Sequence, residues 1–123
     1  PSHLFWQGIE PAAAISALRG AIYHFHAKDT AINKYNTAVN GVLDTKSYGD
    51  IAGRSWVFRT VGYGHGREEW TGIISALKLA GYDGALSIEH EDGLMTPREG
   101  LEKAVAFLKE LIIFDEGGAS GWF

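Results

Sequence analysis

The stretch that decides the fold reads GYDGALSIEHED, residues 81–92. It follows an amphipathic run, 70–77, whose apolar residues recur with the spacing of one helix face. A tight glycine turn then leads into a predicted strand over 85–89, because Gly81 ends the helix and the next residues are apolar. A helix, a glycine turn and a strand make up the repeating unit of parallel α/β proteins.

The same unit occurs earlier in the chain. Pro11 stands in the first helical turn, where proline is favoured, and Ile15 and Leu18 predict an apolar stripe on this helix. Gly20 ends the helix, and 21–27 predicts a strand. Two helix–strand units in one short chain indicate an α/β fold with parallel strands alternating with helices.

A third helix has the strongest start signal in the sequence. Thr96 is a capping residue, Pro97 takes the first helical position and Glu99 completes a capping box. Its predicted buried face consists of Leu101, Val105, Leu108 and Ile112.

A long connection, 28–66, joins the first strand to the second helix, and it contains one strand-like run at 55–61. Connections of this length in compact α/β units usually carry function. Because parallel strands need both faces covered and both edges paired, the few strands here predict either a fragment of a larger protein or a chain that assembles with further copies of itself.

Composition narrows the classes of function. The net charge of −4 argues against a nucleic-acid-binding protein, and the absence of cysteine excludes disulfide and thiolate chemistry. No apolar run approaches the roughly 20 residues that span a bilayer, so we expect no membrane partner and a cytoplasmic location. We interpret residues 1–123 as one domain, with 114–123 as a flexible, glycine-rich tail.

The alternation of side chains along a strand predicts the direction in which each histidine points. In the first strand Ile22, His24 and His26 share one face, whereas Tyr23 and Phe25 share the other. The aromatic face should lie under the helices, so the histidines should face away from them. His24 lies one pleat deeper than His26 and is interpreted as a supporting or packing residue.

In the second strand Leu86 and Ile88 belong to the helix-covered face, and Ser87 and Glu89 to the opposite face. His26 and Glu89 therefore stand at the C-terminal ends of two parallel strands and point the same way. This is where active-site residues lie in (β/α)8 barrels. A hydrogen-bonded structural role is the competing interpretation for each residue.

Two further histidines are interpreted differently. His90 points toward the helices and is predicted to be structural. His65, in the segment GYGHG, is open between a rim residue, a ligand contact and no role.

Four segments in this order resemble a known family: PSHL (1–4), HFHAKD (24–29), RTVGYGHG (59–66) and GYDGALSIEHED (81–92). The chain is similar to the C-terminal part of a sugar phosphate isomerase/epimerase of the xylose isomerase-like barrel superfamily. The resemblance implies the C-terminal portion of a single (β/α)8 TIM barrel, with the N-terminal half absent from this chain.

The resemblance also implies a metal site. Members bind one divalent ion through Glu, Asp, His and Glu, and the last two correspond to His26 and Glu89; the first two would lie outside this chain. His3 matches a substrate-contacting histidine. Arg59 roughly matches a substrate-contacting arginine, and Arg54 is the alternative.

The chemistry of such an enzyme explains these residue types. Moving a proton next to a carbonyl passes through an enediolate, whose charge a divalent ion stabilises while carboxylates carry the proton. Glu89 would be both metal ligand and catalytic acid/base, and Lys28 and Asp29 would orient the imidazole of His26 or close the rim. Mixed carboxylate and imidazole ligands suit Mn, Mg or Co, and Zn is possible.

Alternatives stay open. An endonuclease IV-like DNA repair enzyme is disfavoured by the acidic charge and by the absence of an Asp-x-His segment in the corresponding loop. A non-catalytic fragment or binding module is the second alternative. We expect a sugar or polyol substrate, an isolated chain without activity, and association with further copies or with the missing N-terminal part.

Overall fold

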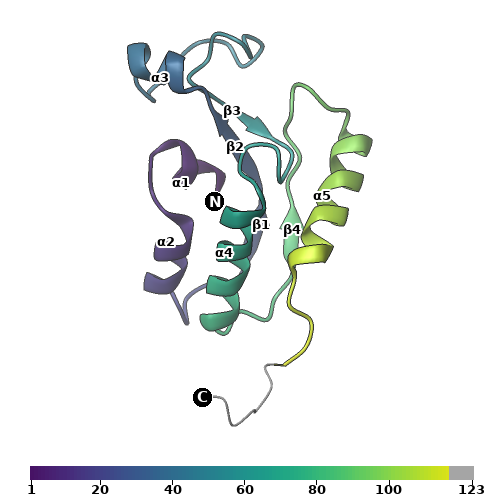
Figure 1. The fold of residues 1–123 in the computed structure, drawn as a ribbon. Helices are drawn as coiled ribbons and strands as arrows, with labels where there is room; N and C mark the ends of the chain where they lie inside the picture. Colours follow the sequence, from purple (N-terminus) through teal and green to yellow (C-terminus); the bar gives the residue numbers. More distant parts are fainter. Residues whose placement is uncertain (117–123) are drawn as a thin grey trace.

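The computed structural model describes residues 1–116, and Figure 1 shows their arrangement. Most of the predicted tail, residues 117–123, lies outside the described residues. In chain order the elements are α1 (Ser2–Trp6), α2 (Pro11–Ala17), β1 (Phe25–Ala27), β2 (Asp29–Ile32), α3 (Lys34–Asn40), β3 (Trp56–Arg59), α4 (Arg67–Leu79), β4 (Leu86–Ile88) and α5 (Pro97–Leu111).

A parallel pair of strands forms the centre of the molecule. β1 and β4 are hydrogen-bonded neighbours, and His26 stands opposite Ser87 in their register. The pairing continues one step past β4, since the Glu89 amide donates to the Ala27 carbonyl over 3.1 Å. The predicted α/β class with parallel strands is confirmed.

Both central strands are shorter than the predicted 21–27 and 85–89. Residues 21–24 find no ladder partner in the described part of the chain, so the regular alternation starts only at Phe25. Ile22 accordingly packs against the core, and Tyr23 is 87% exposed. The prediction that placed Tyr23 under the helices is therefore wrong.

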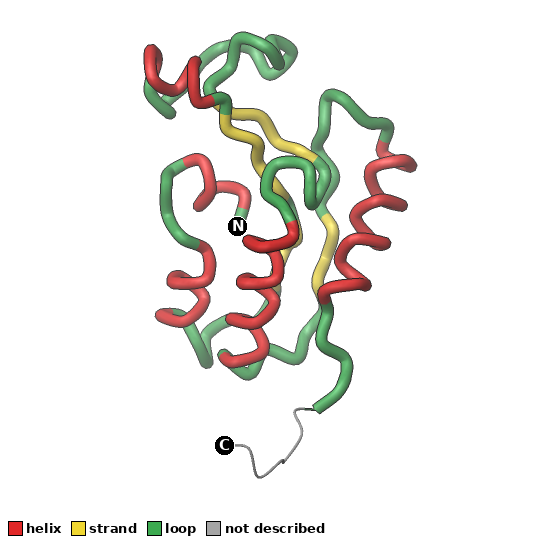
Figure 2. The backbone as a smooth tube through the Cα atoms, viewed as in Figure 1, coloured by secondary structure: helices red, strands yellow, loops and turns green. Residues whose placement is uncertain are grey.

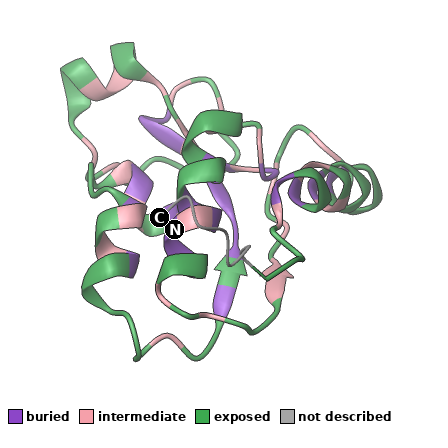
Figure 3. Cartoon of the chain, turned by 60° about the horizontal axis from the view of Figure 1, so that its bottom comes forward, coloured by how far each residue is buried: buried purple, intermediate pink, exposed green. Residues whose placement is uncertain are grey.

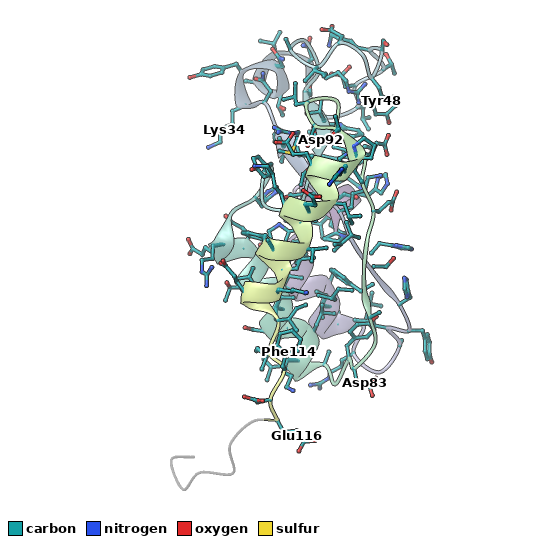
Figure 4. All side chains as sticks on the ribbon, turned by 90° about the vertical axis from the view of Figure 1, so that its right-hand side faces the viewer. Lys34, Tyr48, Asp83, Asp92, Phe114 and Glu116 are labelled. Atoms are coloured by element: carbon teal, nitrogen blue, oxygen red, sulfur yellow. The ribbon has the colours of Figure 1, made fainter. Side chains whose placement is uncertain are left out.

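The helices cover one face of the central strands. In Figure 4 they lie on one side of the strands, and among residues 1–116 no helix covers the other side. The core between the layers consists of Phe5, Ile15, Phe25, Ala27, Val61, Trp70, Ile73, Ile74, Ala76, Leu77, Ala104, Leu108 and Leu111. Burying this apolar surface is the main stabilising term of the fold.

The predicted buried faces of the helices agree with the structure in part. The apolar face of the 70–77 run is buried in α4, as predicted. In α2, Ile15 is buried but Leu18 is 57% exposed, because the helix ends at Ala17 and its last turn lies outside the core. Glu10 caps α2 by accepting a hydrogen bond from the Ala12 amide.

The C-terminal helix α5 starts where predicted, with Thr96 accepting from the Glu99 amide over 3.2 Å. Its buried residues are Gly100, Ala104, Leu108 and Leu111, and only Leu108 belongs to the predicted stripe. Leu101 is 48% exposed, whereas Val105 and Ile112 are half-buried. The helix turns its small residues to the sheet because they allow a close approach.

The long connection 28–66 forms an antiparallel excursion. β2 pairs with β3, with Asp29 opposite Arg59 and Ile32 opposite Trp56. The pair extends beyond the central strands at the top of Figure 2, and α3, between the two strands in the chain, has no buried residue. The strand predicted within 55–61 is confirmed as β3.

None of the helices within residues 1–116 is both long and apolar enough to cross a membrane.

Candidate functional site

A hollow of about 190 Å³ lies at the C-terminal ends of the central strands. Its lining residues are Pro1, Ser2, His3, Leu4, His26, Lys28 and Glu89. This edge is the upper one in Figure 4, where Asp83, before β4, lies low and Asp92, after it, lies high. The structure therefore brings together three of the predicted site residues: His3, His26 and Glu89.

Strand alternation places His26 in the hollow. Phe25 and Ala27 are buried and His26 between them is exposed, and the colours of Figure 3 show this alternation of burial along the strand. Because side chains alternate between the two faces of a strand, His26 faces away from the core. Its ring lies 4.7 Å from that of His24, edge to face. The predicted direction of both histidines agrees with this geometry.

Lys28 holds the carboxylate of Glu89. Its Nζ donates to Glu89 Oε1 over 2.8 Å and to Glu91 Oε2 over 2.6 Å, and it lies 3.9 Å from the centre of the Phe58 ring. The hydrogen bond from Lys28 lowers the pKa of Glu89 despite its partial desolvation. Burial alone would lower the pKa of Lys28, but its two carboxylate partners outweigh burial and raise it. The site therefore holds an ionised carboxylate next to a charged ammonium at neutral pH.

The sequence analysis predicted that Lys28 orients the imidazole of His26 or closes the rim of the site. Its side chain instead bonds to two carboxylates that follow β4. The direction of the Lys28 side chain could have been predicted from the sequence. Side chains two residues apart in an extended segment lie on the same face, and Lys28 is two residues past His26.

Asp29 faces the opposite way and organises the loop before α4. Its Oδ2 accepts from the amides of Gly62, Gly64 and His65 at 3.0, 3.2 and 2.9 Å, and from the Trp70 indole at 3.0 Å. Its Oδ1 lies 2.9 Å from Nδ1 of His65. Asp29 thus orients the imidazole of His65, and the prediction that it might orient His26 is not supported by these contacts.

His3 lines the hollow, and one of its ring nitrogens is already engaged by Trp6. The indole of Trp6 donates to His3 Nδ1 over 3.3 Å, which assigns the proton of the neutral ring to Nε2. The ring also lies edge-on to Phe58, with centroids 5.6 Å apart. A donor in this position suits a substrate hydroxyl or carbonyl oxygen.

The two predicted arginines do not line this hollow. Arg54 is 2% exposed, and its Nε donates to the Trp56 carbonyl over 3.0 Å while its guanidinium lies over the Tyr48 ring. Arg59 donates to Asp92 over 3.0 Å and lines a separate hollow. A substrate contact by either arginine stays a prediction.

His90 lies against Gly100 of α5, on the side of the helices that its strand phase predicted.

The described residues do not make a complete metal site by themselves. His26 and Glu89 supply two donors, and within residues 1–116 no cluster of three or more His, Asp or Glu side chains could hold a metal ion. Glu89 is also engaged by Lys28. Because divalent ions in proteins usually take three or more protein ligands, the pair fits a metal only if further ligands come from outside this chain.

Comparison of the chain with known families identifies the fold to which these strands and helices belong. Residues 1–111 match the family described as xylose isomerase-like TIM barrel, and the chain belongs to it. The family includes sugar isomerases, sugar epimerases and endonuclease IV.

A relative in Bacillus subtilis (strain 168), named "Uncharacterized protein YfiH", is 43% identical over 112 residues. The alignment covers 91% of this chain and 36% of that protein, so the chain spans little more than a third of the relative's length.

Proposed function

We propose that this chain forms part of the active site of a divalent-metal-dependent isomerase or epimerase that acts on a sugar, a sugar phosphate or a polyol. The observation that carries the proposal is that His3, His26, Lys28 and Glu89 line one hollow at the C-terminal ends of parallel strands. In barrels of this type that end of the strands carries the catalytic residues.

Glu89 is the proton carrier in this proposal. Its lowered pKa keeps the carboxylate ionised at neutral pH, so it accepts a proton from a carbon next to a carbonyl and returns it to a neighbouring position. Lys28 holds one carboxylate oxygen by a 2.8 Å hydrogen bond and thereby limits the orientations of the group. His3 donates from Nε2 to a substrate oxygen as negative charge develops there.

His26 and Glu89 are the residues of this chain that would hold a divalent ion, Mn, Mg or Co being favoured and Zn possible. Such an ion acts as a Lewis acid on substrate oxygens. Its remaining ligands would come from outside the chain, so the proposal concerns the whole protein, and the 123 residues alone are expected to be inactive. The expected cytoplasmic location, the absence of nucleic-acid and membrane partners, and assembly with further copies or barrel strands belong to the same proposal.

Proton exchange tests the proposal directly. The whole protein is incubated in D₂O with divalent metal and a panel of aldoses, ketoses and their phosphates, and loss of C–H signals is followed by NMR. We expect exchange with at least one substrate and a 10²- to 10⁴-fold slower rate in the Glu89→Gln variant, the range associated with losing an acid/base group. Glu102→Gln, an exposed carboxylate on α5, is the matched control and should leave the rate unchanged.

Two results would count against the proposal. Exchange that survives Glu89→Gln unchanged would remove Glu89 from the chemistry. A metal-loaded whole protein that exchanges no proton of any sugar in the panel would favour the non-catalytic alternative.

A further inference from the structure

A second and larger hollow lies beside the candidate site. Its volume is about 390 Å³, within the range of small-molecule pockets, whereas the 190 Å³ of the first hollow is below it. The lining residues that matter here are Tyr48, Ile51, Phe58, Arg59, Glu91 and Leu94.

The two hollows share a wall made by Lys28 and its partners. Lys28 lines the first hollow and bonds there to Glu89, while its second bond goes to Glu91, which lines the second hollow. Phe58, under the Lys28 ammonium, also lines the second hollow. A ligand longer than one sugar unit would therefore extend from one hollow into the other across this wall.

Hydrogen bonds fix the position of the polar side chains in the second hollow. Asp92, with no exposed side-chain surface, accepts from Arg59 Nε over 3.0 Å and from the amides of Thr60 and Leu94, each over 2.8 Å. The Arg59 side chain is 16% exposed. Among the hydrogen bonds of the described residues the Arg59 side chain donates only from Nε, and its guanidinium lies over the Tyr63 ring, 5.5 Å from the ring centre.

The apolar side of the second hollow consists of Tyr48, Ile51 and Leu94. Tyr48 and Leu94 are each 60% exposed, whereas Phe58 behind them is buried and carries the Lys28 ammonium over its ring. Rings with an apolar face and polar edges, such as those of sugars, suit an aromatic surface bordered by an arginine and a carboxylate.

Charge decides between a neutral substituent and a phosphate. Among the residues that line the second hollow, the guanidinium of Arg59 stands against the carboxylates of Glu91 and Asp92, which leaves a net charge of −1. Arg59 is already paired with Asp92. A phosphate would add negative charge to this surface, so an uncharged group is favoured.

We propose that the second hollow binds an uncharged sugar ring attached to the ring that reacts in the first hollow, so that the substrate is a disaccharide or a similar glycoside. The inference rests on the proposed function for the identity of the first hollow. The attached ring lies against Tyr48, Ile51 and Leu94, with its hydroxyls within reach of Arg59 and Glu91.

Binding measurements on the whole protein test this. Monosaccharides, neutral disaccharides containing them and the corresponding monosaccharide phosphates are titrated by ligand-observed NMR. We expect a disaccharide to bind at least 10-fold more tightly than its monosaccharide, and Leu94→Trp, which fills the hollow at an exposed position, to abolish that advantage without changing monosaccharide affinity. Tyr48→Ala, which removes the stacking surface, should do the same, and Leu79→Trp, at an 87% exposed position on α4, should not.

Equal affinity for monosaccharides and disaccharides, or a disaccharide advantage that survives Leu94→Trp, would overturn the inference. Preferential binding of the phosphates, lost in Arg59→Met, would overturn it in favour of a phosphate site. Running the proton-exchange assay with the same disaccharides separates the two proposals: exchange by a protein that does not prefer disaccharides refutes the subsite alone, and disaccharide preference without exchange refutes the catalytic role alone.

Discussion

Replacing Asp29 with alanine should be among the most destabilising single changes in this protein. The side chain is completely buried and accepts from three amides of the loop before α4 and from the indole of Trp70. Alanine removes all of these hydrogen bonds at once and leaves a cavity at the start of β2.

The size of the stability loss depends on which of the donors can form hydrogen bonds with water once the carboxylate is gone. Trp70 has no exposed surface, so its indole N–H would be left unsatisfied, at about 1–3 kcal/mol. The amides of Gly62, Gly64 and His65 are half-buried and would be partly rehydrated, so each loses less. We expect the free energy of unfolding to fall by about 4 kcal/mol, a large part of the 5–15 kcal/mol typical of a domain. Asp29→Asn should lose at least about 2 kcal/mol, because its amide group would face donors.

Urea unfolding followed by tryptophan fluorescence measures the change, with Asp83→Asn, at an exposed turn position, as a control within about 0.5 kcal/mol of the original protein. The indole N–H resonance of Trp70 provides an independent reading, since it should shift in Asp29→Asn. A loss below about 1.5 kcal/mol in Asp29→Ala, with an unshifted Trp70 resonance, would refute the reasoning.

Two further predictions concern helix packing and pH. Gly100→Ala should lower the free energy of unfolding by about 1–2 kcal/mol, because the new methyl group would meet the His90 ring. Gly72→Ala, a control position with open space around it, should raise the free energy of unfolding by about 0.5–1 kcal/mol. Equal effects of the two substitutions in thermal unfolding would contradict this prediction. Two backbone amides lower the pKa of Asp44 from 3.8 to about 2, so its contribution to stability is complete above pH 4 and is lost as the pH falls through 2. The difference in stability between Asp44→Asn and the original protein should therefore shrink between pH 4 and pH 2, and a difference constant over that range would contradict the assignment.

Part of the candidate site was predictable from local rules. Side chains alternate along any strand, so His26 and Glu89 could be placed on one face, and at one end, of parallel strands without coordinates. The same rule failed for Ile22 and Tyr23, because residues 21–24 lack a ladder partner in the described chain and do not alternate regularly.

These local rules could not predict contacts between segments that are far apart in the sequence. Lys28 bonds to two carboxylates more than 60 residues away, and only the pairing of β1 with β4 brings them within reach. Asp29 could be foreseen as a functional residue but not as the acceptor that holds the loop at 62–65, since no sequence spacing connects the two.

The sequence by itself determined where α2 and α5 begin, the glycine turns, the parallel α/β class and the strand phase that orients His26 and Glu89. These depend on backbone conformation and on neighbours within a few residues, which the sequence states directly. The tertiary structure alone decided which strands pair, that α5 turns Gly100 and Ala104 to the sheet, and that two hollows meet at Lys28. Those outcomes depend on the packing free energy of the whole chain, in which segments far apart compete for the same partners.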